Sequence, residues 1–218
     1  MKININTNKV VKYLILSDIS FWSAWGLVNP IFAIFIVDNI QGGSVFVVGI
    51  AVSIYWILKS LLVIPIGMLL DSLPSEKDDY FFMVLGLFIA SIVPLGYLFV
   101  KVPWHIYLLQ AIYGLSIAVS ISGWRAIFTR HIDEGKEATE WSIDDAAYGS
   151  GIGISGIVGG WAVSSFGFDF VFIGAGIMGL IATLILLGLK DEIKGVFDNG
   201  ARINFKCIFE KEKVQKDE

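Results

Sequence analysis

The segment YWILKSLLVIPIGMLLD, residues 55–71, places a lysine inside a long apolar run. Tyr55 and Trp56 lie one helical turn before Lys59, so the three side chains share one face of a helix. An ammonium group beside two amphipathic rings is typical of the lining of a polar cavity. These residues predict the binding or passage of a polar solute. The alternative is a lysine that reaches out to water or bonds backbone carbonyls only for structure.

The composition of the chain indicates a membrane protein. Hydrophobic residues make up 56% of the chain, charged residues 17%, and the mean hydropathy is +0.73, whereas soluble proteins are about one quarter charged. Apolar residues form six blocks, each long enough to supply the ~20 residues that cross a bilayer as a helix. The blocks are 13–37, 45–70, 80–100, 104–125, 143–166 and 168–189. We therefore predict an all-α protein with a six-helix transmembrane domain at 13–189.

The segments outside this domain, 1–12 and 190–218, predict the orientation. Lysines precede the first block, Arg130 and Lys136 lie in the break after the fourth, and more basic residues follow the sixth. The first, third and fifth breaks hold only Lys101. By the positive-inside rule both termini are cytoplasmic, and the charged tail is expected to be a solvated, partly disordered end. The expected location is the plasma (inner) membrane of a prokaryote.

Lys59 is predicted to lie near the middle of the bilayer, ~16 Å from the cytoplasmic end of its helix. A charge at that depth costs at least ~2.5 kcal/mol, so we expect it to face a cavity. Helical side chains lean toward their own N-terminus, which directs Asn29 toward the lysine. Pro30 leaves the Gly26 carbonyl free as a second acceptor, although Pro30 is equally consistent with a simple kink. We predict that Lys59 lies near Asn29 and the Gly26 carbonyl.

Other polar residues lie at or within the predicted helices. Gln110 either faces the same cavity or bonds a neighbouring helix. Asp18 and the pair Asp144 and Asp145 are interpreted as solvated acids at helix starts, where they favour the helix dipole. The predicted substrate or coupling pathway consists of Lys59, Tyr55, Trp56, Asn29 and Gln110.

Several motifs lie in a recognisable order along the chain. Gly67-x-x-x-Asp71 ends the second block, LLQAIYGLSIAVS lies in the fourth, and GSGIGISGIVGGWA lies in the fifth. This order resembles one six-helix half of the major facilitator superfamily over roughly 13–189. Gly67 and Asp71 match the start of the family's G-x-x-x-D-R/K-x-G-R-R/K loop signature. Ser72 stands where the family has Arg or Lys, and the fifth block lacks the proline of the antiporter signature.

The resemblance implies a transporter of a small solute by alternating access, not an enzyme. The family usually joins two such halves in one chain, with the substrate between them. The expected partners are therefore the lipid bilayer, the solute, and a second copy of the chain or another half-transporter, the copies forming a parallel homodimer. The resemblance also implies that the face of Gly67 and Asp71 meets the other half. Arg125, at the cytoplasmic end of the fourth block, is the cation best placed near Asp71, so we predict a cytoplasmic gate of Gly67, Asp71 and Arg125. The alternative function is a non-transporting membrane assembly or regulatory subunit.

Two short motifs are interpreted as helix packing and not as sites of chemistry. GISG at 153–156 fits an intramembrane serine protease, but no histidine lies at the depth of Ser155 to act as a base. GAGIMG at 174–179 lies inside an apolar block and follows no strand, so it is not a nucleotide-binding turn. The sequence contains no metal-ligand spacing and no basic nucleic-acid face. We therefore expect no metal, no cofactor and no nucleic-acid partner.

A row of glycines in the fifth block predicts close helix packing. The glycines recur at spacings of three and four residues, which forms a smooth stripe on one face of a helix. They are Gly149, Gly153, Gly156 and Gly160.

Overall fold

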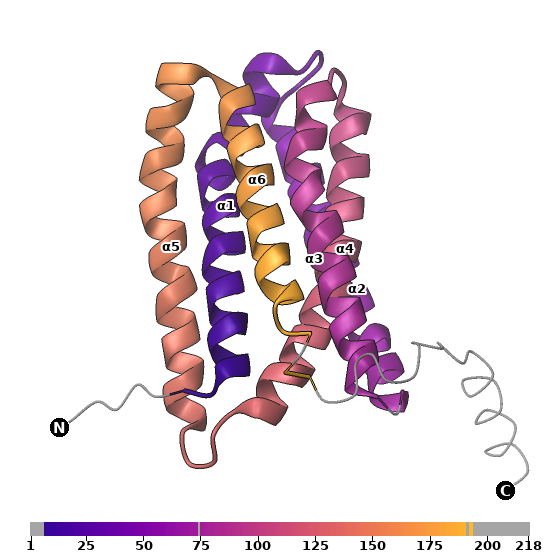
Figure 1. The fold of residues 1–218 in the computed structure, drawn as a ribbon. Helices are drawn as coiled ribbons and strands as arrows, with labels where there is room; N and C mark the ends of the chain where they lie inside the picture. The colour runs from indigo at the N-terminus through magenta and orange to yellow at the C-terminus, as the bar shows by residue number, and fades with distance from the viewer. Residues whose placement is uncertain (1–6, 74, 191, 194–218) are drawn as a thin grey trace, which may run out of the picture.

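The computed structural model describes residues 7–73, 75–190 and 192–193, which form a single bundle of helices (Figure 1). Within these residues there is no strand. The elements are α1 (Lys9–Asn39), α2 (Val45–Ser72), α3 (Glu76–Gly96), the 3₁₀ turn η1 (Tyr97–Phe99), α4 (Pro103–His131), α5 (Glu137–Phe166) and α6 (Phe168–Leu187). We call the end of the bundle at which α1 begins the base, and the opposite end the top. The predicted tail lies largely outside the described residues.

The packing of the helices follows an internal pseudo-symmetry. α1 packs against α5 and α6, α4 packs against α2 and α3, and α3 packs against α6. Exchanging the first three helices with the last three reproduces this pattern. α1 and α4 start at opposite ends of the bundle, so the two triplets are related as inverted repeats. As a result, α1 and α4 are central, whereas α2 and α5 lie on the flanks.

Four helices extend by four or more residues beyond the apolar blocks that predicted them, among them α3, which begins at Glu76 instead of residue 80. α1 begins at Lys9, inside the segment assigned to the N-terminus, and α5 begins at Glu137. α4 continues to His131, past the end of its apolar block. The helices continue past these boundaries because apolar residues in the extensions, such as Val11, Ile127 and Phe128, are fully buried against the bundle. These extensions place several charged residues inside helices instead of at their ends.

Five helices are long and apolar enough to cross a membrane, namely α1, α2, α3 with η1, α4 and α6. α5 is not among them, because acidic residues in its first half and glycines and serines in its second lower its hydropathy. α5 nevertheless lies alongside α1 over its length (Figure 1). The sixth span therefore remains a prediction.

Close contact between α1 and α5 depends on glycines other than the predicted stripe. A Cβ added at Gly159 would lie 2.9 Å from the Cα of Leu27, which only a glycine allows. By contrast, an added Cβ at Gly149, Gly153 or Gly160 would meet nothing within 4 Å. Within the described chain, most of the predicted stripe therefore faces away from other helices, and the α1–α5 contact lies on a different face of α5.

Candidate functional site

A cavity of about 360 Å³ lies in the half of the bundle nearest the base. We call it the base-side cavity. Its walls come mainly from α1, α4 and α5, and Lys59 of α2, Leu87 of α3 and Leu186 of α6 complete the lining. Acidic and basic side chains from α1, α2, α4 and α5 line it: Asp18, Lys59, Arg125, Asp144 and Asp145.

These ionisable residues lie well inside their helices. Asp18 lies about 14 Å above the start of α1, Arg125 about 9 Å before the end of α4, and Lys59 about 20 Å before the end of α2. Charged groups at such depth in apolar helices are costly and mark solute or ion pathways. The depth of this cluster therefore makes the base-side cavity the candidate functional site.

Lys59 and Arg125 form a cationic wall. Lys59 Nζ lies 4.6 Å from the centroid of the Trp56 ring and 5.7 Å from that of Tyr55, so aromatic faces support its charge. Its charged neighbour is Arg125. In the part of the chain that the structure describes, neither cation forms an ion pair with a carboxylate. Two like charges therefore face one cavity without neutralisation.

Asp18 and Asp144 form an acidic wall, opposite in sign to the cationic wall of Lys59 and Arg125. Asp144 is only 4% exposed, and its Oδ1 atom has no hydrogen-bond partner among the described residues. Asp18 has Asp144 as its charged neighbour. Asp145 accepts a hydrogen bond of 2.8 Å from the Tyr148 hydroxyl. The interpretation of Asp144 as a solvated helix-start acid is wrong, because α5 begins two turns earlier and carries this residue into the bundle.

A second cavity, of about 190 Å³, lies nearer the top. We call it the upper cavity. All the residues predicted for the pathway line it: Asn29, Tyr55, Trp56, Lys59 and Gln110. Gln110 is buried, and its Nε2 donates a hydrogen bond of 3.3 Å to the Tyr97 hydroxyl. Gln110 therefore both lines a cavity and bonds a neighbouring element, the two alternatives predicted for it. A direct contact of Lys59 with Asn29 or with the Gly26 carbonyl stays a prediction.

Lys59 and Trp22 line both cavities and so lie between them. Above Lys59, the ring of Tyr113 from α4 stacks on Trp25 of α1 at 3.9 Å and on Tyr55 of α2 at 4.7 Å. The three rings lie about 25 Å above the base. This aromatic layer joins α1, α2 and α4 directly above the charged cluster.

The structure does not bring the predicted gate residues together. Asp71 is exposed at the base end of α2, and an added Cβ at Gly67 would meet nothing within 4 Å. Arg125 instead lines the base-side cavity. Among the described residues no ion pair joins Asp71 to Arg125. Their contact therefore stays a prediction about another conformation.

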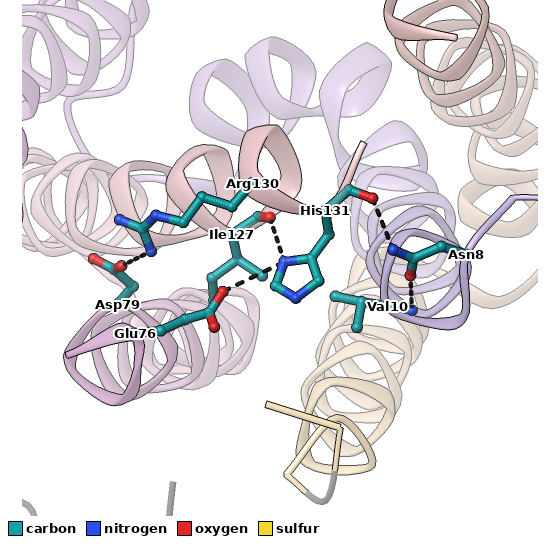
Figure 2. Close-up of polar contacts among 7 residues, drawn as sticks. All are labelled: Asn8, Val10, Glu76, Asp79, Ile127, Arg130 and His131. Atoms are coloured by element: carbon teal, nitrogen blue, oxygen red, sulfur yellow. Dashed lines mark hydrogen bonds and ion pairs between the residues drawn. The ribbon is translucent and has the colours of Figure 1, made fainter. Parts of the chain in front are cut away.

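A polar network at the base was not predicted from the sequence (Figure 2). Asp79 of α3 forms an ion pair with Arg130 of α4, and His131 Nδ1 lies 3.3 Å from Glu76 Oε1. Asn8 caps the start of α1 and also donates a hydrogen bond of 2.8 Å from Nδ2 to the His131 carbonyl. The network therefore joins α1, α3 and α4. The spacing of Glu76 and Asp79, one turn apart at a helix start, is the signal that would have indicated it.

Long apolar helices around a charged internal cavity define an integral, multi-pass helical membrane protein. The family model described as Major Facilitator Superfamily matches residues 14–209, so the chain belongs to this superfamily. A comparison with curated proteins finds no match. Members of the superfamily are generally transporters and not enzymes, and membership confirms the resemblance in the sequence.

Proposed function

We propose that the protein moves a small polar solute across the membrane by alternating access. The observation that carries the proposal is the position of Lys59, which lines both cavities of a bundle that belongs to a transporter family. The solute would bind beside Lys59, with access from the base in the conformation described. The aromatic layer of Trp25, Tyr113 and Tyr55 would separate this site from the top and open in the opposite state.

We also propose that two parallel copies form the complete transporter. Superfamily members place the substrate between two six-helix halves, and the base-side cavity has walls from only one. The flanking helices α2 and α5 carry exposed apolar side chains, such as Ile57 at 56% and Ile154 at 66%. A two-fold axis along the membrane normal would pack α2 of one copy against α5 of the other, and this would cover the cavity.

The base would face the cytoplasm of a prokaryotic cell. Lys9, Lys12, Arg130 and Lys136 all lie at the base, whereas Lys101 lies at the top. This asymmetry is the one that the positive-inside rule describes. The orientation also places the base-side cavity on the cytoplasmic side, which corresponds to an inward-facing state.

Cysteine cross-linking tests the dimer. In a background with Cys207→Ser, variants Ile57→Cys and Ile154→Cys would be co-expressed with different tags, because the two positions lie at similar heights, about 22 and 26 Å above the base. We expect oxidation to trap a disulfide-linked pair of differently tagged chains. Phe88→Cys, exposed on α3, is the control that should remain monomeric. A purified monomer that transports solute would contradict the dimer.

Solute uptake tests the transport function. Solutes that raise the unfolding temperature of the protein in nanodiscs would be assayed for uptake into proteoliposomes. We expect Lys59→Met to abolish uptake of such a solute without loss of folded protein, while Lys101→Met, which removes a lysine outside the cavities, leaves uptake unchanged. Unaltered uptake by Lys59→Met would exclude a role for the lysine. Failure of the wild type to transport any bound solute would support the non-transporting alternative.

A further inference from the structure

The two charged walls of the base-side cavity lie on separate helix pairs. Lys59 and Arg125 belong to α2 and α4, which pack together, whereas Asp18 and Asp144 belong to α1 and α5, which also pack together. The pseudo-symmetry of the bundle exchanges these two helix pairs. The cavity therefore has a cationic wall on one side and an acidic wall on the other. Within each wall the neighbouring charge has the same sign, since Asp18 lies near Asp144 and Lys59 lies near Arg125.

This separation is unfavourable within a single copy of the chain. Opposite charges in a low-dielectric cavity attract strongly and form ion pairs when their side chains can reach each other. Within the described residues they do not pair. Asp144 is buried and Asp18 and Lys59 are partly buried, whereas Arg125 is exposed, so charge on the first three groups costs free energy unless another group supplies the opposite charge.

Two polar atoms on this cavity, one of them in the acidic wall, lack partners. Asp144 Oδ1 is an acceptor and Trp124 Nε1 is a donor, and both atoms are buried without a hydrogen-bond partner among the described residues. Both residues are among those that line the cavity and both are more than nine-tenths buried. Buried polar groups without partners are rare in folded proteins. The base holds three more such atoms, namely Glu76 Oε1, Asp79 Oδ1 and Glu140 Oε1, but only the acceptor of Asp144 and the donor of Trp124 belong to residues that line one cavity. A ligand with both donor and acceptor groups would complete this site.

We infer that the base-side cavity binds a zwitterionic solute. Lys59 and Arg125 hold its oxyanion group, with Trp124 Nε1 as an additional donor, and Asp18 and Asp144 hold its ammonium group. This inference rests on the proposed function and names its substrate class. An anion alone would leave the acidic wall unneutralised, a cation alone would leave the cationic wall unneutralised, and a neutral solute would leave both.

The size and the remaining lining of the cavity agree with a small zwitterion. A volume of about 360 Å³ lies at the low end of the ~300–1,000 Å³ found for ligand pockets. Phe21, Trp22 and Trp141 also line it, and their rings suit an apolar body between the two charged groups. An amino acid with an apolar side chain has this combination of groups.

Ligand binding to the full chain in nanodiscs tests the inference without any substitution. Leucine and phenylalanine would each be compared with the N-acetyl form, which lacks the ammonium, and with the carboxamide form, which lacks the carboxylate. Thermal unfolding and calorimetry would report affinity. We expect at least one free amino acid to bind at least ten-fold more tightly than both of its capped forms. The same panel includes phosphoethanolamine, a zwitterion with a phosphate in place of the carboxylate. Comparison of its affinity with that of the amino acids shows which oxyanion the site prefers.

Paired variants assign each half of the solute to a wall. Lys59→Met with Arg125→Gln should abolish the preference for the amino acid over its carboxamide, while the preference over the N-acetyl form remains. Asp18→Asn with Asp144→Asn should give the reverse result. Lys101→Met and Asp169→Asn remove the same kinds of charge near the top and should change neither preference.

The outcomes separate this inference from the proposed function. Equal binding of an amino acid and a capped form by the wild type would overturn the zwitterion assignment, as would a panel in which no zwitterion binds. Uptake of a neutral solute into proteoliposomes would overturn it as well while supporting transport. Binding of zwitterions without any uptake would support the assignment and contradict the transport function.

Discussion

Two arginines on α4, separated by little more than one helical turn, have opposite surroundings. Arg130 lies at the base and pairs with Asp79, a carboxylate whose side chain is only 3% exposed. Arg125 lies on the cavity, where its charged neighbour is Lys59 and no carboxylate pairs with it in the described part of the chain. The same side chain on the same helix thus has an ion-pair partner in one region and none among the described residues in the other.

The contrast extends to the two regions as a whole. At the base, Glu76 and His131 approach each other, and Asn8 satisfies a helix end and a carbonyl from another helix (Figure 2). In the cavity, charges of one sign share a wall and the opposite sign lies across from them. Neutralised charges fix the relative positions of helices, whereas unneutralised charges favour a ligand that brings the missing charge.

The largest expected effect is the loss of Arg130. Arg130→Gln leaves the buried Asp79 carboxylate without its cation, and we expect a destabilisation of about 2 kcal/mol, less than the ~3–5 kcal/mol of a fully buried pair because the arginine side chain is 46% exposed. Arg125→Gln, the matched control on the same helix, should change stability by less than about 0.5 kcal/mol. Denaturant unfolding in detergent measures both.

A double-mutant cycle sharpens this result. Asp79→Asn in the Arg130→Gln background should recover part of the loss, because no carboxylate then remains unpaired. Equal stability of Arg130→Gln and Arg125→Gln would show that the base does not depend on paired charges.

The next effect concerns Asn8, whose side chain makes two contacts at the base. Its oxygen accepts a hydrogen bond of 2.7 Å from the Val10 backbone nitrogen, and its nitrogen donates to the His131 carbonyl. Asn8→Ala should cost about 1–2 kcal/mol, as expected for a helix cap with a second hydrogen bond. Asn39→Ala, at the exposed far end of α1, is the control with little effect. Similar losses for the two variants would contradict the role of Asn8.

The long apolar helices were predictable because lipid requires apolar blocks of that length, although only five of the helices are apolar enough to count as candidate spans. The helix ends were not predictable, since the segments 9–12, 76–79, 126–131 and 137–142 carry charged residues outside the long apolar blocks and yet continue the helices. This difference moved Asp144 and Arg125 from expected ends into the bundle. It also placed Arg130 on α4 opposite Asp79 of α3, so the base network was missed.

The pathway residues were predictable to the extent that each carries a polar group at an unusual depth. Lys59, Asn29 and Gln110 come from three different helices and line one cavity. The separation of the charged residues of the base-side cavity into a cationic and an acidic wall was not predictable, because it depends on which helices pack together. Helix pairing in this bundle is set by glycines such as Gly159, whose role depends on a helix phase that a regular stripe of glycines does not indicate.

A smaller effect is expected when the cavity loses a charge. Lys59→Met removes an ammonium group that lacks an ion pair among the described residues, and we expect a gain in stability of about 1 kcal/mol. The gain should accompany loss of solute binding, whereas Lys101→Met should leave both quantities unchanged. Thermal unfolding in nanodiscs measures the first quantity and calorimetry the second. A loss of stability would show that Lys59 supports the fold through its aromatic neighbours.

The smallest effect concerns Asp71 and the state of the gate. Asp71 is exposed in the inward-facing arrangement proposed here, and Arg125 lies in the cavity. We expect the two to meet only when the base closes, where an exposed contact is worth about 0.5 kcal/mol and shifts a balanced equilibrium about two-fold. Asp71→Asn should therefore favour the state that is open at the base, without a change in unfolding temperature.

Labelling of single cysteines measures this shift. In the Cys207→Ser background, Ile121→Cys reports on the base-side cavity and Val52→Cys on the upper cavity. Asp71→Asn should raise the labelling rate at Ile121→Cys from the cytoplasmic side and lower that at Val52→Cys from outside, because a two-state bundle cannot open one end without closing the other. Glu134→Gln, an exposed acid in the loop at the base, is the control that should change neither rate. Equal rates in Asp71→Asn and in Glu134→Gln would mean that Asp71 only ends a helix, and that the unpaired charges of the cavity act on the solute without any contribution from the gate.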